Sequence, residues 1–395
     1  MDFRSTDEEV AFRKEVTDFI RGLLPPDWVG TDPGLGEESK EDIYPLAREI
    51  WRKLGAKGWI GMSWPREYGG HEEPLWKEMV LAEEMAYLGA PGIDIAMAEG
   101  EVILEFGTEE QKRRFVPPIC RGEVKWAMGM SEPNAGSDTF ALQTTALEGQ
   151  DCFLLNGQKT WSTNAHHADW CVVYARTDPG APKHLGISAL IVDLRSPGIT
   201  MRQITEITNV PAFCEVFYDN VRVPKENLLG EKNRASAILL YAFAAERTSG
   251  LFILHNARRY LGQLVDYCKE TYANGKPLAE DDLVRNRLAQ LAIDIELGCD
   301  LGCKLNWMAC QRMPTIRESC QIKVYGAIVV QRLANLGMQI LGLYGQLDEG
   351  SKWAKLRGRM RHTYLSSVST SIAGGTSEIS KNHIAGRYGL GLPRG

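Results

Sequence analysis

The sequence has no long uninterrupted apolar run. No stretch approaches the ~18–20 apolar residues that a membrane-spanning helix needs, and residues 1–24 mix acidic and apolar positions as an amphipathic helix does. Secretion signals and transit peptides begin with basic, acid-poor segments instead. We therefore expect no membrane span and a cytoplasmic location.

A disulfide framework is also missing. The nine cysteines are odd in number and follow no regular spacing, which is typical of reduced thiols. Cys299 and Cys303 share one face of a predicted helix, but no second pair follows at zinc-ligand spacing, so we expect them to be small buried side chains. His166 and His167 are adjacent and lack a cysteine or carboxylate at ligand spacing, so we expect loop residues and no metal site.

An excess of basic residues is absent as well. Lys and Arg total 45 against 51 Asp and Glu, and the net charge of -6 argues against nucleic-acid binding. A local basic groove for the phosphates of a small ligand is compatible with this charge. With 395 residues, 44% of them hydrophobic and 24% charged, the chain can form two or three cores of a globular protein.

Helical patterns fill residues 1–122, which we predict to be an N-terminal helical domain. Thr6 and Glu9 form a capping box, and apolar residues from Val10 to Leu23 then recur at helical spacing until two prolines end the run. Further helices are predicted around 46–54, over 74–89, and after a cap formed by Thr108 and Gln111.

Residues 123–234 have a different pattern, which predicts a central antiparallel β-barrel or sandwich domain. Short β-rich segments there are bounded by Gly, Pro, Asn or Asp. The segments are 152–155, 171–176, 187–194 and 213–217.

Residues 235–395 return to helical periodicity and predict a C-terminal four-helix bundle. The predicted helical segments are 235–272, 281–311, 316–343 and 352–370, separated by Gly- or Pro-containing breaks. The expected fold class is therefore α+β, with three domains and no internal repeat.

Residues 126–164 are the most informative stretch for function. Met128 to Ser131 form a short extended run that leads into a loop of small residues, which can bring bare backbone close to a ligand. Asn156-Gly157 predicts a turn, and strand alternation then places Trp161 and Thr163 on one face. An aromatic plate beside a hydroxyl suits a flat, redox-active ring whose edge nitrogen needs a donor.

The loop Ser131–Asp138, SEPNAGSD, and the strand Trp161–Asn164, WSTN, resemble the FAD-binding middle domain of the acyl-CoA dehydrogenase family. Further matches in the expected order extend the resemblance to nearly all 395 residues. They are Met1-Asp2-Phe3, Trp64-Pro65, Tyr68-Gly69-Gly70, Gly107 to Gln111 and Gly375 to Ile379.

The resemblance implies the acyl-CoA dehydrogenase fold, FAD as cofactor, and oxidation of an acyl-CoA substrate to a trans-2-enoyl-CoA. It also implies an electron-transfer flavoprotein as the electron acceptor, and a role in fatty acid or lipid catabolism. Two alternatives stay open on the sequence. One is an acyl-CoA oxidase on the same fold, which passes electrons to O₂. The other is a non-catalytic subunit that completes the site of another chain.

The resemblance also assigns ligand contacts. It implies flavin contacts from Met128, Met130, Ser131, Gly136, Ser137, Trp161 and Thr163 in the β domain, and from Gln339, Thr376 and Glu378 in the C-terminal domain. It implies acyl-CoA contacts from Ser137, Arg247 and Gly374, with the backbone N–H of Gly374 donating to the thioester carbonyl.

The catalytic base is missing from its most common position. Many family members carry a Glu two residues before the Thr of the C-terminal loop, and this chain has Gly374 there. A minority pattern, in enzymes resembling isovaleryl-CoA and long-chain acyl-CoA dehydrogenases, has the Glu on the first helix of the C-terminal domain, directly before an Arg. Glu246-Arg247 match it.

The neighbours of Glu246 one helical turn away are small: Ala242, Ser249 and Gly250 leave room for a ligand. Most helical Glu residues are solvated or ion-paired, but the glycine at 374 favours Glu246 as the base.

Assembly is left open by the sequence. Many homodimeric members use Arg, Thr and Phe before a Gly to reach the FAD of the neighbouring subunit, and here those positions are Thr271, Ala273 and Asn274. The adenine loop keeps Gln339 but has Leu343 in place of a Gly. The chain could form a homodimer or homotetramer, or a heterotetramer with a homologous chain that carries the missing Arg.

Overall fold

The computed structural model describes residues 4–31, 37–92, 95–246, 250–386 and 389–392, without the side chains of 244–246, 250 and 251. The chain forms two compact units. One comprises 1–35, 79–91 and 247–395, and the other comprises 36–78 and 92–246. The three-domain division at 122 and 234 stays a prediction.

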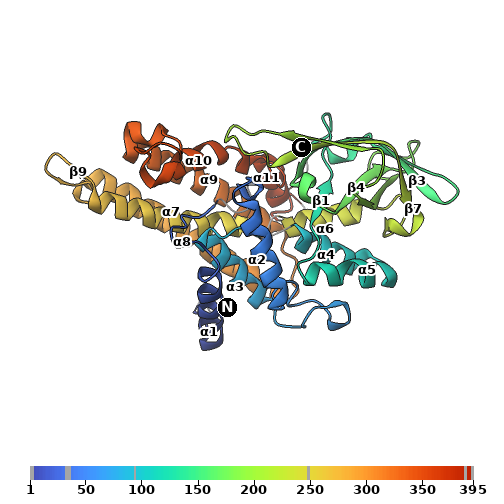
Figure 1. Cartoon of the computed structure of the whole chain (residues 1–395), viewed down its shortest axis with the longest axis horizontal. Coiled ribbons are helices and arrows are strands. Elements are labelled where there is room, and N and C mark those ends of the chain that lie inside the picture. Colours follow the sequence, from blue (N-terminus) through green and yellow to red (C-terminus); the bar gives the residue numbers. More distant parts are fainter. Residues whose placement is uncertain (1–3, 32–36, 93–94, 247–249, 387–388, 393–395) are drawn as a thin grey trace. The chain divides into compact units, whose positions relative to one another are not determined.

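The second unit is built on one mixed sheet (Figure 1). Its strand order is β6-β7-β3-β2-β4-β5-β8, and β1 pairs with β4. The strands are β1 (Trp126–Gly129), β2 (Thr145–Glu148), β3 (Cys152–Thr163), β4 (Trp170–Arg176), β5 (Ile187–Asp193), β6 (Ile199–Ile204), β7 (Phe213–Pro224) and β8 (Leu228–Leu229). The four predicted segments lie within or overlap β3, β4, β5 and β7, and the predicted extended run from Met128 overlaps β1, whereas β2, β6 and β8 were not predicted.

The sheet is not wholly antiparallel as expected. Both β1 and β2 pair with β4 in parallel, with Gly129 opposite Val173 and Thr145 opposite Arg176. The two strands therefore follow one another along β4, and residues 130–144 leave the sheet between them. This interrupted strand explains the parallel pairs, because the chain re-enters the sheet in the direction in which it left.

The predicted turn at Asn156-Gly157 is wrong. The chain continues through both residues as β3, and its pairing with β7 shifts register between Leu155 and Gly157. Gly157 has φ 143, and a Cβ there would lie 2.6 Å from Thr144 Oγ1. The glycine therefore marks a bulge at a close approach.

Helices α2 (Tyr44–Ala56), α4 (Ala96–Phe106), α5 (Glu109–Cys120) and α6 (Ser236–Glu246) accompany the sheet. The capping box of α5 is confirmed, since the Thr108 side chain accepts from Gln111 N and the Gln111 side chain accepts from Thr108 N. Gln111 Nε2 also donates to the carbonyls of Glu226 and Leu228 at 2.7 and 2.8 Å, which attaches α5 to the strand region.

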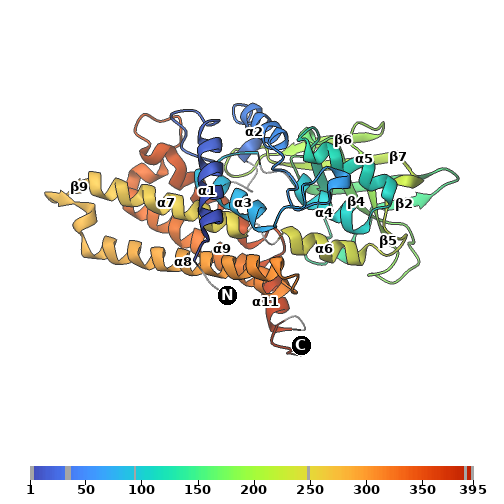
Figure 2. The ribbon, with the colours of Figure 1, turned by 90° about the horizontal axis from the view of Figure 1, so that it is seen from below.

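The first unit is helical. It contains α1 (Asp7–Arg21), most of α3 (Trp76–Leu88), α7 (Gly250–Glu270), α8 (Asp282–Cys310), α9 (Ile316–Leu341), α10 (Arg359–Ser366), α11 (Ser377–Ala385) and the hairpin β9 (Tyr272–Ala273) and β10 (Lys276–Pro277). Helices α7, α8 and α9 pack on one another, and α10 and α11 pack on α9 (Figure 2). The predicted helix over 352–370 is shortened to α10, because Leu356 and Arg357 have left-handed backbone conformations.

Three details of this unit test the sequence reading. The predicted capping box of α1 is confirmed by Glu9 N donating to Thr6 Oγ1 at 3.2 Å and Thr6 N donating to Glu9 Oε2 at 2.8 Å. Val10 was expected on the apolar face but is 56% exposed. Cys303 was expected to be buried and is exposed, while Cys299 is buried.

One stretch of the described residues, Ile316–Gln346, is long and apolar enough to cross a membrane, and half of its apolar 18-residue window is buried inside the structure. Its buried side chains include Ile322, Val329 and Leu333, which pack in the core of the helical unit with Leu264 and Leu291. This is the pattern of a core helix in a bundle.

Two glycines give matched tests of the packing. A Cβ on Gly55 of α2 would lie 2.4 Å from the backbone C and O of Arg121, whereas one on exposed Gly262 of α7 would meet no heavy atom within 4 Å. We expect Gly55→Ala to destabilise the protein by about 1–3 kcal/mol. We expect Gly262→Ala to stabilise it by up to about 1 kcal/mol through helix propensity. Thermal unfolding checks both, and a lower melting temperature for both variants would contradict the packing.

Candidate functional site

The excursion between β1 and β2 carries most of the predicted flavin contacts in the central sheet domain. Met128 is in β1 and partly exposed, Met130 is buried, and Ser131 is partly exposed. Glu132 and Ala135 exchange two backbone hydrogen bonds of 3.0 and 3.1 Å, which closes a tight turn. The turn brings Gly136 and Ser137 to the surface.

A buried ion pair holds this loop on β3. Lys159 Nζ donates to Glu132 Oε1 at 2.7 Å and to the Met130 carbonyl at 3.1 Å. Glu132 also accepts from the backbone N–H groups of Gln143 and Thr144 at 2.6 and 2.9 Å. Both arms of the loop are therefore attached to one pair of charges.

The electrostatics of the pair follow from its burial. Desolvation lowers the pKa of Lys159 to about 8, although the Glu132 charge opposes this. Desolvation alone would raise the pKa of Glu132, but Lys159 and the hydrogen bonds from Thr144 and Gln143 bring that pKa below its ordinary value. The pair is stable because each charge has its counter-charge and its hydrogen bonds.

The end of β3 presents Trp161 and Thr163. Trp161 has φ 60 and is 57% exposed, with its ring edge-on to Phe213 at 5.8 Å. Ser162 between them is buried, and Thr163 is partly exposed. Trp161 and Thr163 are both more exposed than Ser162, which agrees with the prediction that they share one face of the strand. The register shift between Lys159 and Ser162 was not predicted.

The two segments with predicted flavin contacts are attached to each other. Thr160 N donates to the Ser131 carbonyl at 2.9 Å. Beyond the strand, Asn164 has φ 53, its N–H donates to the Ala212 carbonyl at 2.8 Å, and its side chain is hydrogen-bonded to Ser39. Met130, Ser131 and Trp161 therefore belong to one cross-linked surface.

The two adjacent histidines follow this strand in a 3-10 turn, Ala165–His167. His167 stacks on Tyr44 with ring centroids 3.7 Å apart, and His166 Nδ1 lies 3.2 Å from Cys214 Sγ. Desolvation, with the charges of His166, Lys125 and Arg48, lowers the pKa of His167 to about 4, so the ring is neutral. In the described part of the chain, no group of three or more His, Cys, Asp or Glu could hold a metal ion.

The predicted contacts of the helical unit lie on two segments. Gln339 is on α9 and accepts a 2.5 Å hydrogen bond from Arg287 Nη1. Thr376 is the N-cap of α11, its hydroxyl accepting from Ile379 N at 3.2 Å, and Glu378 is exposed in the first turn. The helix-cap reading of Thr376 is therefore confirmed, and it leaves the helix N-terminus able to face an anion.

The two candidate base positions differ in conformation. Gly374 and Gly375 have φ 66 and 88, a region that disfavours residues with a side chain. Glu246 is the last residue of α6, and its side chain is outside the description. Arg247 and Ser249 lie outside the described residues, while Ala242 is fully buried.

The positions expected to reach a neighbouring subunit lie at the end of α7. Asn274 and Gly275, with φ 52 and 82, form the tip of the β9–β10 hairpin, which projects from the ends of α7 and α8 (Figure 1). Ala273 is exposed, and Thr271 is partly exposed. Leu343 is 81% exposed.

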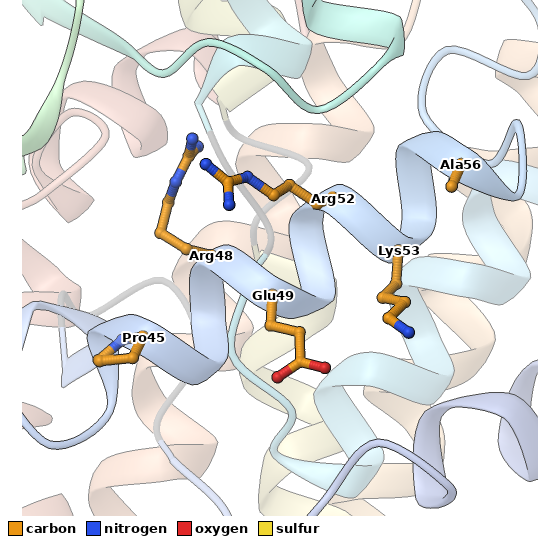
Figure 3. A pocket seen from close by; sticks show the side chains of 6 residues that line it. All are labelled: Pro45, Arg48, Glu49, Arg52, Lys53 and Ala56. Atoms are coloured by element: carbon orange, nitrogen blue, oxygen red, sulfur yellow. The ribbon is translucent and has the colours of Figure 1, made fainter.

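A shallow groove on α2 contains none of the predicted site residues. It is lined by Pro45, Arg48, Glu49, Arg52, Lys53 and Ala56. Figure 3 shows the guanidinium groups of Arg48 and Arg52 facing one another, with Glu49 and Lys53 pointing elsewhere. The groove is basic, and its Arg48 is near enough to His167, which follows β3, to help lower the pKa of that histidine.

Family models match the chain in three consecutive parts. The N-terminal domain of acyl-CoA dehydrogenase matches residues 6–123, the middle domain 127–221 and the C-terminal domain 236–389. Acyl-CoA dehydrogenase FadE26 of Mycobacterium tuberculosis is 30% identical over 98% of both chains. Acyl-CoA dehydrogenase IpdE1 of the same species is 32% identical over 97% of both. The chain belongs to the acyl-CoA dehydrogenase family.

Solved structures of acyl-CoA dehydrogenases have the same fold. The "Tcur3481-Tcur3483 steroid ACAD" has a TM-score of 0.89 and 29% identity over all of both chains. The ChsE4-ChsE5 complex of Mycobacterium tuberculosis has a TM-score of 0.88, 29% identity and the same coverage. The glutaryl-CoA complex of glutaryl-CoA dehydrogenase has a TM-score of 0.83 and 27% identity over 98% of both chains. The protein is an oxidoreductase that dehydrogenates acyl-CoA thioesters and depends on FAD.

The residues of the central sheet domain in this acyl-CoA dehydrogenase have an exposure and backbone geometry that suit FAD. The indole of Trp161 is 57% exposed, and the backbone φ of 60 is unusual for a bulky residue. A flat ring stacked on this indole would cover its apolar face. The space beside Gly136 is open, since a Cβ there would meet no heavy atom within 4 Å. Ser131, close to Gly136 in the chain, and Thr163, close to Trp161, are both partly exposed residues that carry a hydroxyl.

Sequence reasoning missed the pair of Lys159 and Glu132, although Glu132 lies in the SEPNAGSD loop and Lys159 only two residues before the WSTN strand. Strand alternation alone places Lys159 on the same face as Trp161 and Thr163. The register shift between Lys159 and Ser162 separates their faces, so no local pattern marked Lys159 as buried and in need of a counter-charge.

We expect Lys159→Met to weaken FAD binding at least tenfold and to lower the melting temperature. The substitution leaves the Glu132 charge buried and unpaired, which costs about 3–5 kcal/mol, and releases the loop. Titration of apoprotein with FAD, followed by flavin fluorescence, measures the affinity.

Lys183→Met is the matched control for this loop. Lys183 pairs with Asp138, and both side chains are more than half exposed, so the pair contributes little. We expect FAD affinity within about twofold of the wild type. Equal losses in the two variants would contradict a special role for the buried pair.

Proposed function

We propose that Glu246 removes the α-proton of an acyl-CoA thioester and that the product is the trans-2-enoyl-CoA. The observation that carries the proposal is the backbone at the alternative position: Gly374 is held at φ 66, where a glutamate would be strained. Meanwhile α6 ends on Glu246, directly before Arg247 as in the minority family pattern. A carboxylate is a suitable base once its pKa is matched to the reaction.

The other predicted residues would position the reactants. We assign Met128, Met130, Ser131, Gly136, Ser137, Trp161, Thr163, Gln339, Thr376 and Glu378 to FAD, and Ser137, Arg247 and Gly374 to the acyl-CoA. The backbone N–H of Gly374 would donate to the thioester carbonyl, which stabilises negative charge as the α-proton leaves. Bound FAD supplies the acceptor for the β-hydride at flavin N5.

We propose an electron-transfer flavoprotein as electron acceptor, a cytoplasmic location and a role in fatty acid or lipid catabolism. The relatives named acyl-CoA dehydrogenases support this over the oxidase alternative. The experiment first lets the substrate reduce the bound flavin and then exposes the reduced enzyme to air or to a redox dye. The acceptor that takes the electrons separates the two alternatives. Rapid dye reduction with little peroxide supports the dehydrogenase, and stoichiometric peroxide supports the oxidase.

We expect Glu246→Gln to lower kcat by about 10²–10⁴-fold or more, because loss of a general base has effects of this size, while FAD stays bound. The assay is bleaching of flavin absorbance by a panel of acyl-CoA thioesters. Glu270→Gln is the control, since Glu270 is also the last residue of a helix but is exposed at the end of α7. Near-normal turnover of Glu246→Gln would contradict the assignment of Glu246 as the catalytic base.

We propose that a homologous partner chain completes the FAD site of this protein. The exposed hairpin offers no cation at Thr271, Ala273 or Asn274, and exposed Leu343 stands where the family has glycine in the adenine loop. An Arg–phosphate contact contributes roughly 1.5–3 kcal/mol, so its loss weakens a site shared by two identical chains. The similar Tcur3481-Tcur3483 and ChsE4-ChsE5 structures each pair two named chains, which supports this assembly.

We therefore expect protein expressed alone to contain well under one FAD per chain, and co-expression with a homologue that carries the Arg to restore both flavin and turnover. Flavin released by denaturation, divided by protein concentration, gives the ratio, and light scattering gives the assembly size. One tightly bound FAD per chain in an active homodimer or homotetramer would eliminate the heteromer.

A further inference from the structure

Trp161, which the proposed function assigns to FAD, lies in a β-bulge near the end of β3. The pairing of β3 with β7 shifts register between Lys159 and Ser162, so two residues of β3 lie opposite one residue of β7. A bulge redirects a side chain away from the regular alternation of a strand. The direction of the Trp161 indole therefore depends on how firmly the chain is held on each side of the bulge.

On the far side of the bulge, Asn164 attaches the end of the strand to two other segments. Its N–H donates to the Ala212 carbonyl at 2.8 Å. Its side-chain Oδ1 accepts from Ser39 Oγ, and its Nδ2 donates to Glu38 Oε1 at 3.3 Å. Both functions of the amide are therefore engaged with residues that lie 125 and 126 positions earlier in the chain.

The segment that Asn164 contacts is itself anchored. Ser39 is buried, and the neighbouring Glu37 is fully buried and forms an ion pair with Lys40 at 2.9 Å. Tyr44 at the start of α2 stacks on His167, with ring centroids 3.7 Å apart and planes at 10°. A polar contact and an aromatic contact therefore join this segment to the turn that follows β3, and both lie within the second unit.

We propose that Asn164 is a positioning residue for FAD: it joins the end of β3 to Glu38 and Ser39, and so fixes the direction in which Trp161 presents its indole to the flavin. The inference rests on the proposed function, because that function assigns Trp161 to FAD. Asn164 acts through the strand and not by contact with the flavin. Thr163 directly precedes Asn164, so the same attachment holds the Thr163 hydroxyl.

Asn164→Gly tests the attachment. Glycine adopts a φ of 53 without strain, so the variant loses the side-chain hydrogen bonds and keeps the backbone conformation. In titrations of the full-length apoprotein, with its partner chain if one is required, we expect FAD binding to weaken by at least about fivefold, the scale of one lost hydrogen bond. We also expect the visible circular dichroism of the bound flavin to change in the same direction as in Trp161→Ala. A residue with a purely structural role would lower the melting temperature and leave this flavin signal unchanged.

Asn209→Gly is the matched control. Asn209 is exposed, belongs to the same unit and also has a left-handed backbone, with φ 64. In the described part of the chain its side chain makes no hydrogen bond. We expect this variant to keep the wild-type flavin signal and an FAD affinity within about twofold of the wild type, as for other surface substitutions.

An exchange of donor and acceptor makes the test specific. Asn164→Asp places a carboxylate beside the carboxylate of Glu38, so we expect a loss at least as large as in Asn164→Gly. Adding Glu38→Gln to Asn164→Asp supplies an amide that can donate to the new carboxylate. We expect this double variant to recover most of the flavin signal and affinity. An unchanged signal in Asn164→Gly, or no recovery in the double variant, overturns the positioning role.

Trp161→Ala separates this inference from the proposed function. If Trp161→Ala binds FAD with the wild-type affinity and circular dichroism, Trp161 does not contact the flavin, and both the assignment of Trp161 and the positioning role fail. If Trp161→Ala changes the flavin signal and Asn164→Gly does not, only the positioning role fails.

Discussion

The buried ion pair of Lys159 and Glu132 is the interaction on which the predicted flavin surface of the central sheet domain depends. The pair receives hydrogen bonds from Gln143 and Thr144 and donates one to Met130, so it attaches both ends of the excursion at 130–144 to β3. A loop of small and polar residues has little apolar surface to hold it, and its geometry comes instead from a charge pair that is costly to break.

Backbone strain at the end of β3 accompanies this ion pair. Trp161 at φ 60 and Asn164 at φ 53 each adopt a conformation that costs of order 1–3 kcal/mol for a residue with a side chain. The β3–β7 ladder and the hydrogen bond from Asn164 N to Ala212 hold the chain in this form. The apolar face of the exposed indole is removed from water only when a flat ligand covers it. The free energy gained by this burial offsets part of the strain.

Local chemistry made much of the fold predictable, whereas features set by pairing between distant segments were not. The capping boxes at Thr6 and Thr108 depend on residues three positions apart and were read correctly. The bulge at Gly157 depends on the approach of Thr144, and the parallel pairs depend on where the chain re-enters the sheet. No local pattern records either distance. The flavin motifs were found by resemblance, but the ion pair of Lys159 with Glu132 depends on the loop lying against β3, which no local pattern records.

Glycine at 374 changes what α6 has to do. A base on the loop would leave α6 free to serve only as packing, but with Glu246 at its C-terminal end the helix would carry the proton acceptor. Ala242, one turn before Glu246, is fully buried, and α6 packs on α4 within the same unit. The position of the proposed base would therefore be set by helix packing and not by the conformation of a loop.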